Sequence, residues 1–287
     1  MTAPTPSIDY AALKSGGIIM QKDDDFFALR LRLPGGSIPA ELLSKIAQVA
    51  KKYGRGEVRL TARAGIEIHW IKFRDIEAAR KELAEAGLAL GPCGPRFRTV
   101  TACSGLPVCR RALADSQSFA RQIDQNFSGQ QLPHKFKVTV SACPNGCSRP
   151  LENEIGFCAA VQPYMEKDAC MGCGLCVDIC REKALVLQDG KPLLDGSRCV
   201  HCADCMQSCP TDAWKTERMG YAVYAGGKNG RHAELGEKIA DFVGEEQGMM
   251  IIERCLDFYL QHGNKRERLG EMMRRFGMDE FKAFVLR

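Results

Sequence analysis

The stretch KFKVTVSACPNGCSRP, residues Lys135–Pro150, places a pair of cations shortly before a pair of thiols. Polar residues alternate with apolar ones along its first half, which predicts a strand with Lys135 and Lys137 on the same side. The Pro-Asn-Gly sequence then predicts a sharp turn between Cys143 and Cys147. A function for this chain has to account for both pairs and for their closeness in the sequence.

The composition is that of a globular protein of one or two domains, with 287 residues, 45% of them hydrophobic and 26% charged. The formal net charge is +5, but the basic residues are dispersed and no aromatic-basic motif accompanies them, so we expect no nucleic-acid partner. No apolar stretch is long enough to cross a bilayer, and the first residues, MTAPTPSIDY, lack the pattern of an export signal. We therefore expect a soluble, cytoplasmic protein without a membrane partner.

Fifteen cysteines are the unusual feature of the composition. The odd count and the expected cytoplasmic location argue against a disulfide framework and favour metal ligation. Eight of the cysteines form two runs with the spacing C-x2-C-x2-C-x3-C, at Cys170, Cys173, Cys176 and Cys180 and again at Cys199, Cys202, Cys205 and Cys209. Zinc is the alternative ligand, but zinc sites usually use cysteine pairs well separated in the sequence.

This double run matches the bacterial ferredoxins with two [4Fe–4S] clusters. In that arrangement the fourth cysteine of each run ligates the cluster of the other run. The expected ligand sets are Cys170, Cys173, Cys176 and Cys209 for one cluster, and Cys199, Cys202, Cys205 and Cys180 for the other.

Four further cysteines form two pairs, Cys103 and Cys109 with C-x5-C spacing, and Cys143 and Cys147 with C-x3-C spacing. Their spacing alone leaves zinc and an iron–sulfur cluster equally open. Cys93, Cys158 and Cys255 stay outside these sets, and the apolar neighbours of Cys158 and Cys255 indicate core positions.

Secondary-structure patterns predict an α+β chain with an insertion. Residues 26–90 are expected to form strand, helix, strand, strand and helix. The following part has a mixed pattern, with helices expected at about residues 110–126, at AELGEKIADFV (233–243) and at MMIIERCLDFYLQHG (249–263). The cysteine-dense residues 163–215 interrupt it. We therefore expect a unit at 1–90, a second at 91–162 and 216–287, and an insert at 163–215.

The C-x5-C and C-x3-C pairs with their Asn-Gly turn resemble the sulfite and nitrite reductase family. The segments LRLRLPGG around Arg30, VRLTARAGIEIHW around Arg63, LPHKFKVTV around Lys135 and YAGGKNGR around Gly226 resemble family segments in the family's order. The resemblance implies a sulfite reductase-like half-repeat: a ferredoxin-like α+β half-domain, a siroheme and [4Fe–4S] domain, and an inserted ferredoxin domain with two more clusters. It also implies that Cys103, Cys109, Cys143 and Cys147 hold the third [4Fe–4S] cluster, and that Cys147 bridges to the siroheme iron.

The same resemblance implies the residues that bind substrate and cofactor. Sulfite is a compact anion, and the family surrounds it with two arginines and two lysines, here Arg30, Arg98, Lys135 and Lys137. The siroheme carboxylates are expected to contact a larger set: Arg59, Thr61, Arg63, Asn145, Gly226, Gly227, Lys228, Asn229 and Arg231.

These observations predict a siroheme-dependent sulfite reductase that reduces sulfite to sulfide with six electrons. No dinucleotide-binding fingerprint is present, so an external donor protein or reductase subunit is expected to supply the electrons. Because one repeat carries both the cluster cysteines and the lysine pair, we expect a homodimer. Two alternatives stay open: a siroheme nitrite reductase that forms ammonia, and a non-catalytic iron–sulfur electron-transfer subunit.

Overall fold

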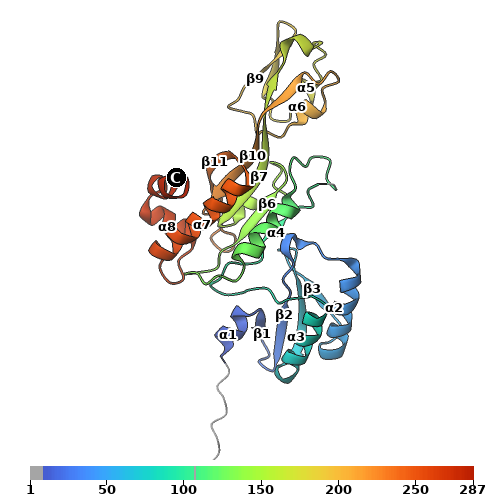
Figure 1. Ribbon diagram of the computed structural model, residues 1–287, viewed down its shortest axis with the longest axis vertical. Coiled ribbons are helices and arrows are strands. Elements are labelled where there is room, and N and C mark those ends of the chain that lie inside the picture. The colour runs from blue at the N-terminus through green and yellow to red at the C-terminus, as the bar shows by residue number, and fades with distance from the viewer. Residues whose placement is uncertain (1–8, 107) are drawn as a thin grey trace, which may run out of the picture.

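The computed structural model describes residues 9–106 and 108–287. The first eight residues, on which the expectation about an export signal largely rests, lie outside the described part. Figure 1 shows three parts along the long axis: an N-terminal unit, a central sheet with its helices, and a lobe that stands away from the rest. The chain has mixed α and β structure, as the sequence predicts.

The N-terminal unit is a four-stranded sheet covered by two helices. After the short helix α1 (Tyr10–Ser15), its strands follow the order β1-β2-β4-β3, with bounds Ile18–Met20, Phe26–Arg30, Ile66–Lys72 and Val58–Leu60. The amphipathic helices α2 (Ala40–Tyr53) and α3 (Ile76–Glu85) bury Val49 and Leu83 against Ile68 of β4 in one core. The predicted order of strands and helices within residues 26–90 is confirmed.

The central sheet combines parallel and antiparallel strands in the order β11-β10-β7-β6-β5. The strands are β5 (Thr101–Ala102), β6 (Val138–Ser141), β7 (Ile155–Met165), β10 (Trp214–Ala225) and β11 (Glu237–Val243). β5, β6 and β7 pair in parallel, whereas β10 runs antiparallel to both β7 and β11. β6 therefore lies between two neighbours, which explains why all four of its residues are buried.

Four helices complete the core of this sheet. They are α4 (Ser116–Phe127), α7 (Glu245–His262), α8 (Leu269–Phe276) and α9 (Met278–Val285). Phe119 of α4, Ile252 of α7 and Phe281 of α9 are fully buried in one cluster with Phe157 of β7. The C-terminal helices thus belong to the main core and are not an appendage.

Residues 166–213 connect the far ends of β7 and β10 and form the protruding lobe (Figure 1). The lobe contains α5 (Leu175–Ile179), the hairpin β8 (Leu185–Gln188) and β9 (Lys191–Leu194), and α6 (Asp204–Gln207). Its hydrophobic cluster has three buried members, Cys176, Leu185 and Trp214. So small a core supplies little folding free energy, and small domains of this kind usually depend on metals or disulfides.

Three local expectations differ from the structure. Residues 237–243 form strand β11 and not a helix, because the exposed edge of β10 takes them as a partner and buries Ile239 and Val243. Helix α4 begins at Ser116, where the Asp115 carboxylate accepts hydrogen bonds from the backbone N–H groups of Gln117 and Ser118. Strand β6 begins at Val138, so Lys135 and Lys137 precede the regular strand.

Gly227 generates a stability prediction. A Cβ atom at this position would collide with the backbone carbonyl oxygen atoms of Leu151 and Asn153, whereas one at Gly244 would meet nothing. We expect Gly227→Ala to lower the free energy of unfolding by about 1–3 kcal/mol, and Gly244→Ala to change it much less. Denaturant titration of both variants measures this. Equal stabilities would contradict the packing role given to Gly227.

Candidate functional site

The two cysteine pairs outside the lobe meet at one edge of the central sheet. Cys103 follows β5, and Cys143 and Cys147 follow the neighbouring parallel strand β6, so both pairs lie at the carboxyl ends of adjacent strands. The backbone N–H of Ala142 donates to Cys103 Sγ over 3.1 Å. Cys109 lies on the exposed loop that leads to α4.

The chemistry of this set fits a metal cluster. Burial raises the pKa of Cys143, and the nearby thiols of Cys103, Cys109 and Cys147 raise it further. Neighbouring thiols that resist ionisation need positive metal ions to become thiolates. Among the described residues, no three His, Cys, Asp or Glu side chains converge closely enough to share one metal ion. A four-iron cluster distributes its cysteines over separate iron atoms and tolerates this wider spacing.

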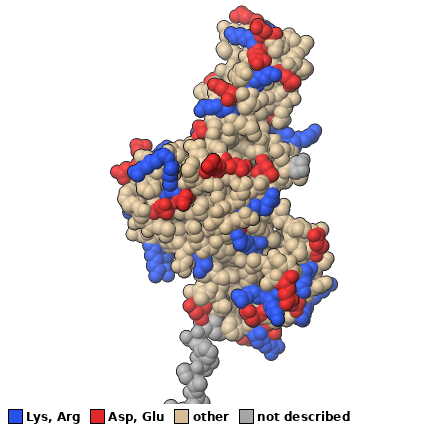
Figure 2. Space-filling model, viewed as in Figure 1, with Lys and Arg blue, Asp and Glu red and all other residues tan. Residues whose placement is uncertain are grey.

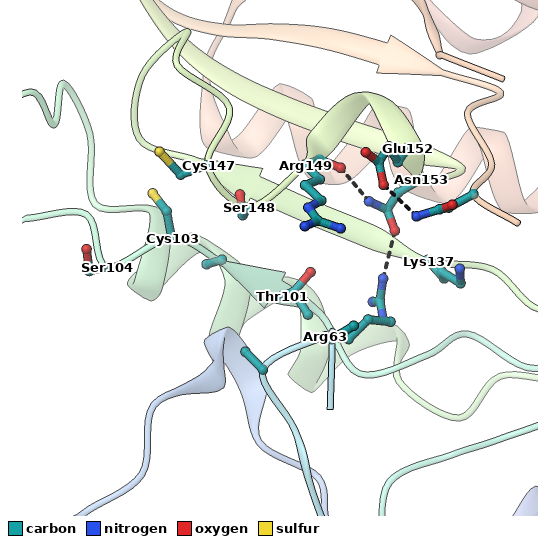
Figure 3. Close-up of a pocket in the computed structure, with 14 residues that line it drawn as sticks. Arg63, Thr101, Cys103, Ser104, Lys137, Cys147, Ser148, Arg149, Glu152 and Asn153 are labelled. Atoms are coloured by element: carbon teal, nitrogen blue, oxygen red, sulfur yellow. Dashed lines mark hydrogen bonds between the residues drawn. The ribbon is translucent and has the colours of Figure 1, made fainter. Parts of the chain in front are cut away.

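A cavity of about 410 Å³ is lined by two of these cysteines, Cys103 and Cys147. Figure 3 shows the sulfur atoms of Cys103 and Cys147 at one end and the side chains of Arg63 and Lys137 at the other. Asn229 also lines the cavity and donates to Glu152 Oε2 over 2.7 Å. The cavity therefore places two thiols and three basic side chains, Arg63, Lys137 and Arg149, around one space.

Arg63 is fixed by acceptors from two other segments. Its Nη1 donates to Asn153 Oδ1 over 2.7 Å and its Nη2 to the carbonyl oxygen of Thr99 over 3.0 Å. Asn153 in turn donates to the carbonyl oxygen of Arg149 over 2.8 Å. Burial lowers the pKa of Arg63 to about 10, with the positive charges of Arg98 and Arg30 adding to the effect. Arg63 still carries its charge at neutral pH.

Two further cavities share lining arginines with this one or with each other. One of about 250 Å³ is lined by Arg30, Thr61, Arg63 and Arg98, so Arg63 borders both it and the first cavity. The other, of about 820 Å³, is lined by Arg98 and Lys135 together with Lys14, Arg96, His134, Lys265 and Arg266. Arg63 thus lines both the first and the second cavity, and Arg98 lines both the second and the third.

Lys135 and Lys137 flank the buried Phe136, as the alternation predicts, but they line different cavities, Lys137 the first and Lys135 the third. Burial lowers the pKa of Lys137 to about 8, and the charge of Arg63 contributes. Burial also lowers the pKa of Lys135. An ammonium group with a pKa near 8 both attracts an anion and releases a proton at physiological pH.

The buried carboxylate of Glu154 supports the backbone of Lys137. Its side chain is 1% exposed, its Oε2 accepts from the backbone N–H of Lys137 over 2.9 Å, and its other oxygen pairs with Arg268. Arg268 is the residue immediately before α8. The C-terminal helices therefore reach the site through this ion pair.

The residues expected around siroheme carboxylates do not all lie at the cavities. Thr61, Arg63 and Asn229 line the cavities, as described above. Lys228 is held by Glu234 and Glu271 over 3.2 and 2.9 Å. Exposed positions are occupied by three others: Arg59, Asn145 and Arg231. Gly226 and Gly227 are buried, and Gly226 packs directly against Gly270 of α8, which gives this glycine turn a packing role.

Sequence reasoning missed Asn153, Arg149 and Glu154. It also missed Glu67 and Cys93, both of which accept hydrogen bonds from Arg30. The first three follow Cys147 in a short irregular segment, SRPLENE, that has no periodic pattern. Arg149 adopts a left-handed backbone conformation with φ of 59°, and only the folded chain shows that this turn directs its neighbours toward the cavity. The one signal in the sequence that could have indicated a role here is a charged residue, Arg149, two positions after Cys147.

The cysteines of the lobe are arranged as two related halves. Ala184 N–H donates to Cys180 Sγ and Ala213 N–H to Cys209 Sγ, each over 3.3 Å and each four residues after the acceptor. One cavity is lined by cysteines of both runs: Cys180, Cys199, Cys202 and Cys205. Burial raises the pKa of Cys205 to about 12, which again indicates a thiol that needs a metal to ionise. Backbone N–H donors to sulfur are typical of iron–sulfur sites.

An ion pair joins the lobe to the loop that carries Cys109. Arg111 Nη1 lies 2.8 Å from one carboxylate oxygen of Asp204, which is next to Cys205 in α6. On the face shown in Figure 2, basic and acidic side chains are interspersed over the lobe and the N-terminal unit, without one large patch of a single sign. In the described part of the chain, no helix combines the length and the apolar character that a membrane crossing requires.

Comparisons with known proteins agree with this architecture. Residues 19–86 match the nitrite/sulfite reductase ferredoxin-like half domain, and residues 93–287 match the nitrite and sulphite reductase 4Fe-4S domain. The chain belongs to the nitrite and sulfite reductase family. The resemblance drawn from its cysteine pairs and its Arg30, Arg63, Lys135 and Gly226 segments is thereby confirmed.

Individual relatives cover most of the chain. It is 34% identical to a coenzyme F420-dependent sulfite reductase of Methanocaldococcus jannaschii over 93% of its own length, but spans only 43% of that protein. It is 27% identical to one of the subunits of the anaerobic sulfite reductase of Salmonella typhimurium, with 90% of this chain and 83% of that polypeptide covered. The crystal structure of dissimilatory sulfite reductase I has the same fold, with a TM-score of 0.75, 22% identity, and 91% and 69% of the two chains covered.

Proposed function

We propose that this chain is a siroheme-dependent sulfite reductase. The observation that carries the proposal is the cavity in which Cys103 and Cys147 lie opposite Arg63 and Lys137. An electron carrier has no need of such a cationic cavity beside its cluster, whereas an enzyme that reduces an anion requires one. The family match and the relatives named as sulfite reductases support the same function.

The residues present fit the cofactors that this function requires. Cys103, Cys109, Cys143 and Cys147 would hold a [4Fe–4S] cluster, with Cys147 shared with the siroheme iron, and Thr61, Arg63 and Asn229 would contact siroheme carboxylates. Bound siroheme supplies a redox-active iron that accepts a ligand, and the chain supplies position, charge and protons.

Arg30, Arg98, Lys135 and Lys137 would act on the substrate. A guanidinium group offers a fixed pair of donors to the oxygen atoms of sulfite. As oxygen leaves as water, each step consumes protons, and the lowered pKa of Lys137 makes its ammonium group a suitable donor. Complete reduction of sulfite to sulfide takes six electrons.

The lobe is the proposed entry for those electrons. The shared cavity of Cys180, Cys199, Cys202 and Cys205 supports the crossed ligand sets of a ferredoxin with two [4Fe–4S] clusters. The Arg111–Asp204 ion pair joins the lobe to the Cys109 loop. The electrons would come from a separate donor protein or subunit. We further propose a homodimer, because one repeat carries both the cluster cysteines and the cations.

Turnover of two substrates tests the proposal. Purified holoprotein is supplied with one chemically reduced donor, and the formation of sulfide from sulfite is compared with that of ammonia from nitrite. We expect efficient sulfide formation, a lower kcat/KM for nitrite, and a loss of at least about 100-fold in sulfite turnover for Lys137→Ala with unchanged iron content. Preference for nitrite would make the chain a nitrite reductase, and no turnover of either substrate would leave an electron-transfer subunit.

The lowered pKa of Lys137 predicts a pH dependence. Its ammonium group is charged below pH 8 and loses its proton as the pH rises through about 8. We expect kcat/KM for sulfite to fall with rising pH in this range, and Lys137→Arg to move the fall to higher pH because arginine keeps its charge. A pH profile of both proteins checks this. An identical alkaline limb in Lys137→Arg would assign the limb to another group.

A further inference from the structure

Cys93 is a buried cysteine that lies outside every proposed cluster set. Its side chain is 1% exposed, and its Sγ lies 2.9 Å from Arg30 Nη1 and 3.4 Å from Arg98 Nη2. Arg30 ends β2 in the N-terminal unit, whereas Arg98 precedes β5 of the central sheet. One sulfur atom therefore accepts hydrogen bonds from two guanidinium groups that belong to different parts of the fold.

Each arginine is also held on a second side. Arg30 Nε donates to Glu67 Oε1 over 2.7 Å, and the two residues are direct partners in the register of β2 and β4. Arg98 Nε donates to the carbonyl oxygen of Pro92, next to Cys93 in the chain, over 2.7 Å. The two guanidinium groups are thus fixed separately by Glu67 and Pro92 and together by the sulfur.

Electrostatics explains why a shared acceptor is needed. Arg30, Arg63 and Arg98 line the same cavity of about 250 Å³. Burial lowers the pKa of Arg98, the charge of Arg30 lowers it further, and Cys93 and the carboxylates of Glu154 and Glu67 oppose this effect. Guanidinium groups without an acceptor between them would repel one another across the cavity.

We propose that Cys93 is a positioning residue that holds Arg30 and Arg98 in one orientation, so that their remaining N–H groups bind a single small oxyanion. The inference rests on the proposed function, since the oxyanion is sulfite only if the cavity serves a sulfite reductase. Burial alone does not account for Cys93. Cys255 is equally buried in the apolar core of α7, and no arginine donates to it among the described contacts.

Three variants test the proposal: Cys93→Ala removes the acceptor, Cys93→Ser keeps a smaller one, and Cys255→Ala controls for a lost buried thiol. Sulfite is titrated into the oxidised holoprotein by calorimetry, and KM and kcat are measured with a reduced donor. We expect Cys93→Ala to weaken sulfite binding about tenfold, mainly through KM. Cys93→Ser should stay within about threefold of the natural protein, as should Cys255→Ala.

Unchanged sulfite affinity in Cys93→Ala would overturn the proposal, and so would equal losses in Cys93→Ala and Cys93→Ser, because packing and not hydrogen bonding would then be responsible. Crystal structures of Cys93→Ala and Cys93→Ser test the positioning role separately from the proposed function, because they report the positions of Arg30 and Arg98 without a need for sulfite binding. If the natural protein fails to bind sulfite, the proposed function fails. The positioning role then stands only if the guanidinium groups of Arg30 and Arg98 move apart in Cys93→Ala and keep their places in Cys93→Ser.

Discussion

The concentration of cations at one edge of the central sheet is the constraint on which the rest of the site depends. Arg30, Arg63, Arg98 and Lys137 line adjoining cavities, and burial together with mutual repulsion lowers the pKa values of Arg63 and Lys137. Such a group is costly to desolvate unless acceptors surround it. The structure provides side-chain acceptors for the arginines in Glu67, Asn153 and Cys93, and the buried Glu154 accepts from the backbone N–H of Lys137. An anion between the cations would reduce the remaining repulsion.

The fold explains how cations and thiols reach the same place. Parallel pairing of β5, β6 and β7 puts the loops that follow β5 and β6 at one edge, and these loops carry the four cysteines. The N-terminal unit contributes Arg30 from the end of β2 and Arg63 from the turn between β3 and β4, and Arg268, at the start of α8, pairs with Glu154. Every part of the chain except the lobe therefore supplies the cavity or its support. The lobe is carried outward by β7 and β10 and contacts the site region through Arg111 and Asp204.

Much of this was readable from the sequence, for identifiable reasons. Cysteine spacing is a local property, so the two pairs and the two runs were visible at once, and strong periodicity predicted α2, α3 and α7. The β11 segment was misread because an edge strand takes its structure from its neighbour and not from its own pattern. Glu154 and Cys93 were unreadable because their roles depend on partners 114 and 63 residues away in the chain.

The most direct test of the account is the optical spectrum of anaerobically purified protein, with iron and acid-labile sulfide counted on the same sample. The account predicts a haem Soret band with a red-region band, and about thirteen iron atoms per chain, four for each of three cubes and one for the siroheme. Iron equivalent to three cubes without haem absorption, after expression with siroheme biosynthesis supplied, would contradict the central claim. It would show that the cationic cavity beside Cys147 does not hold the cofactor on which sulfite reduction depends.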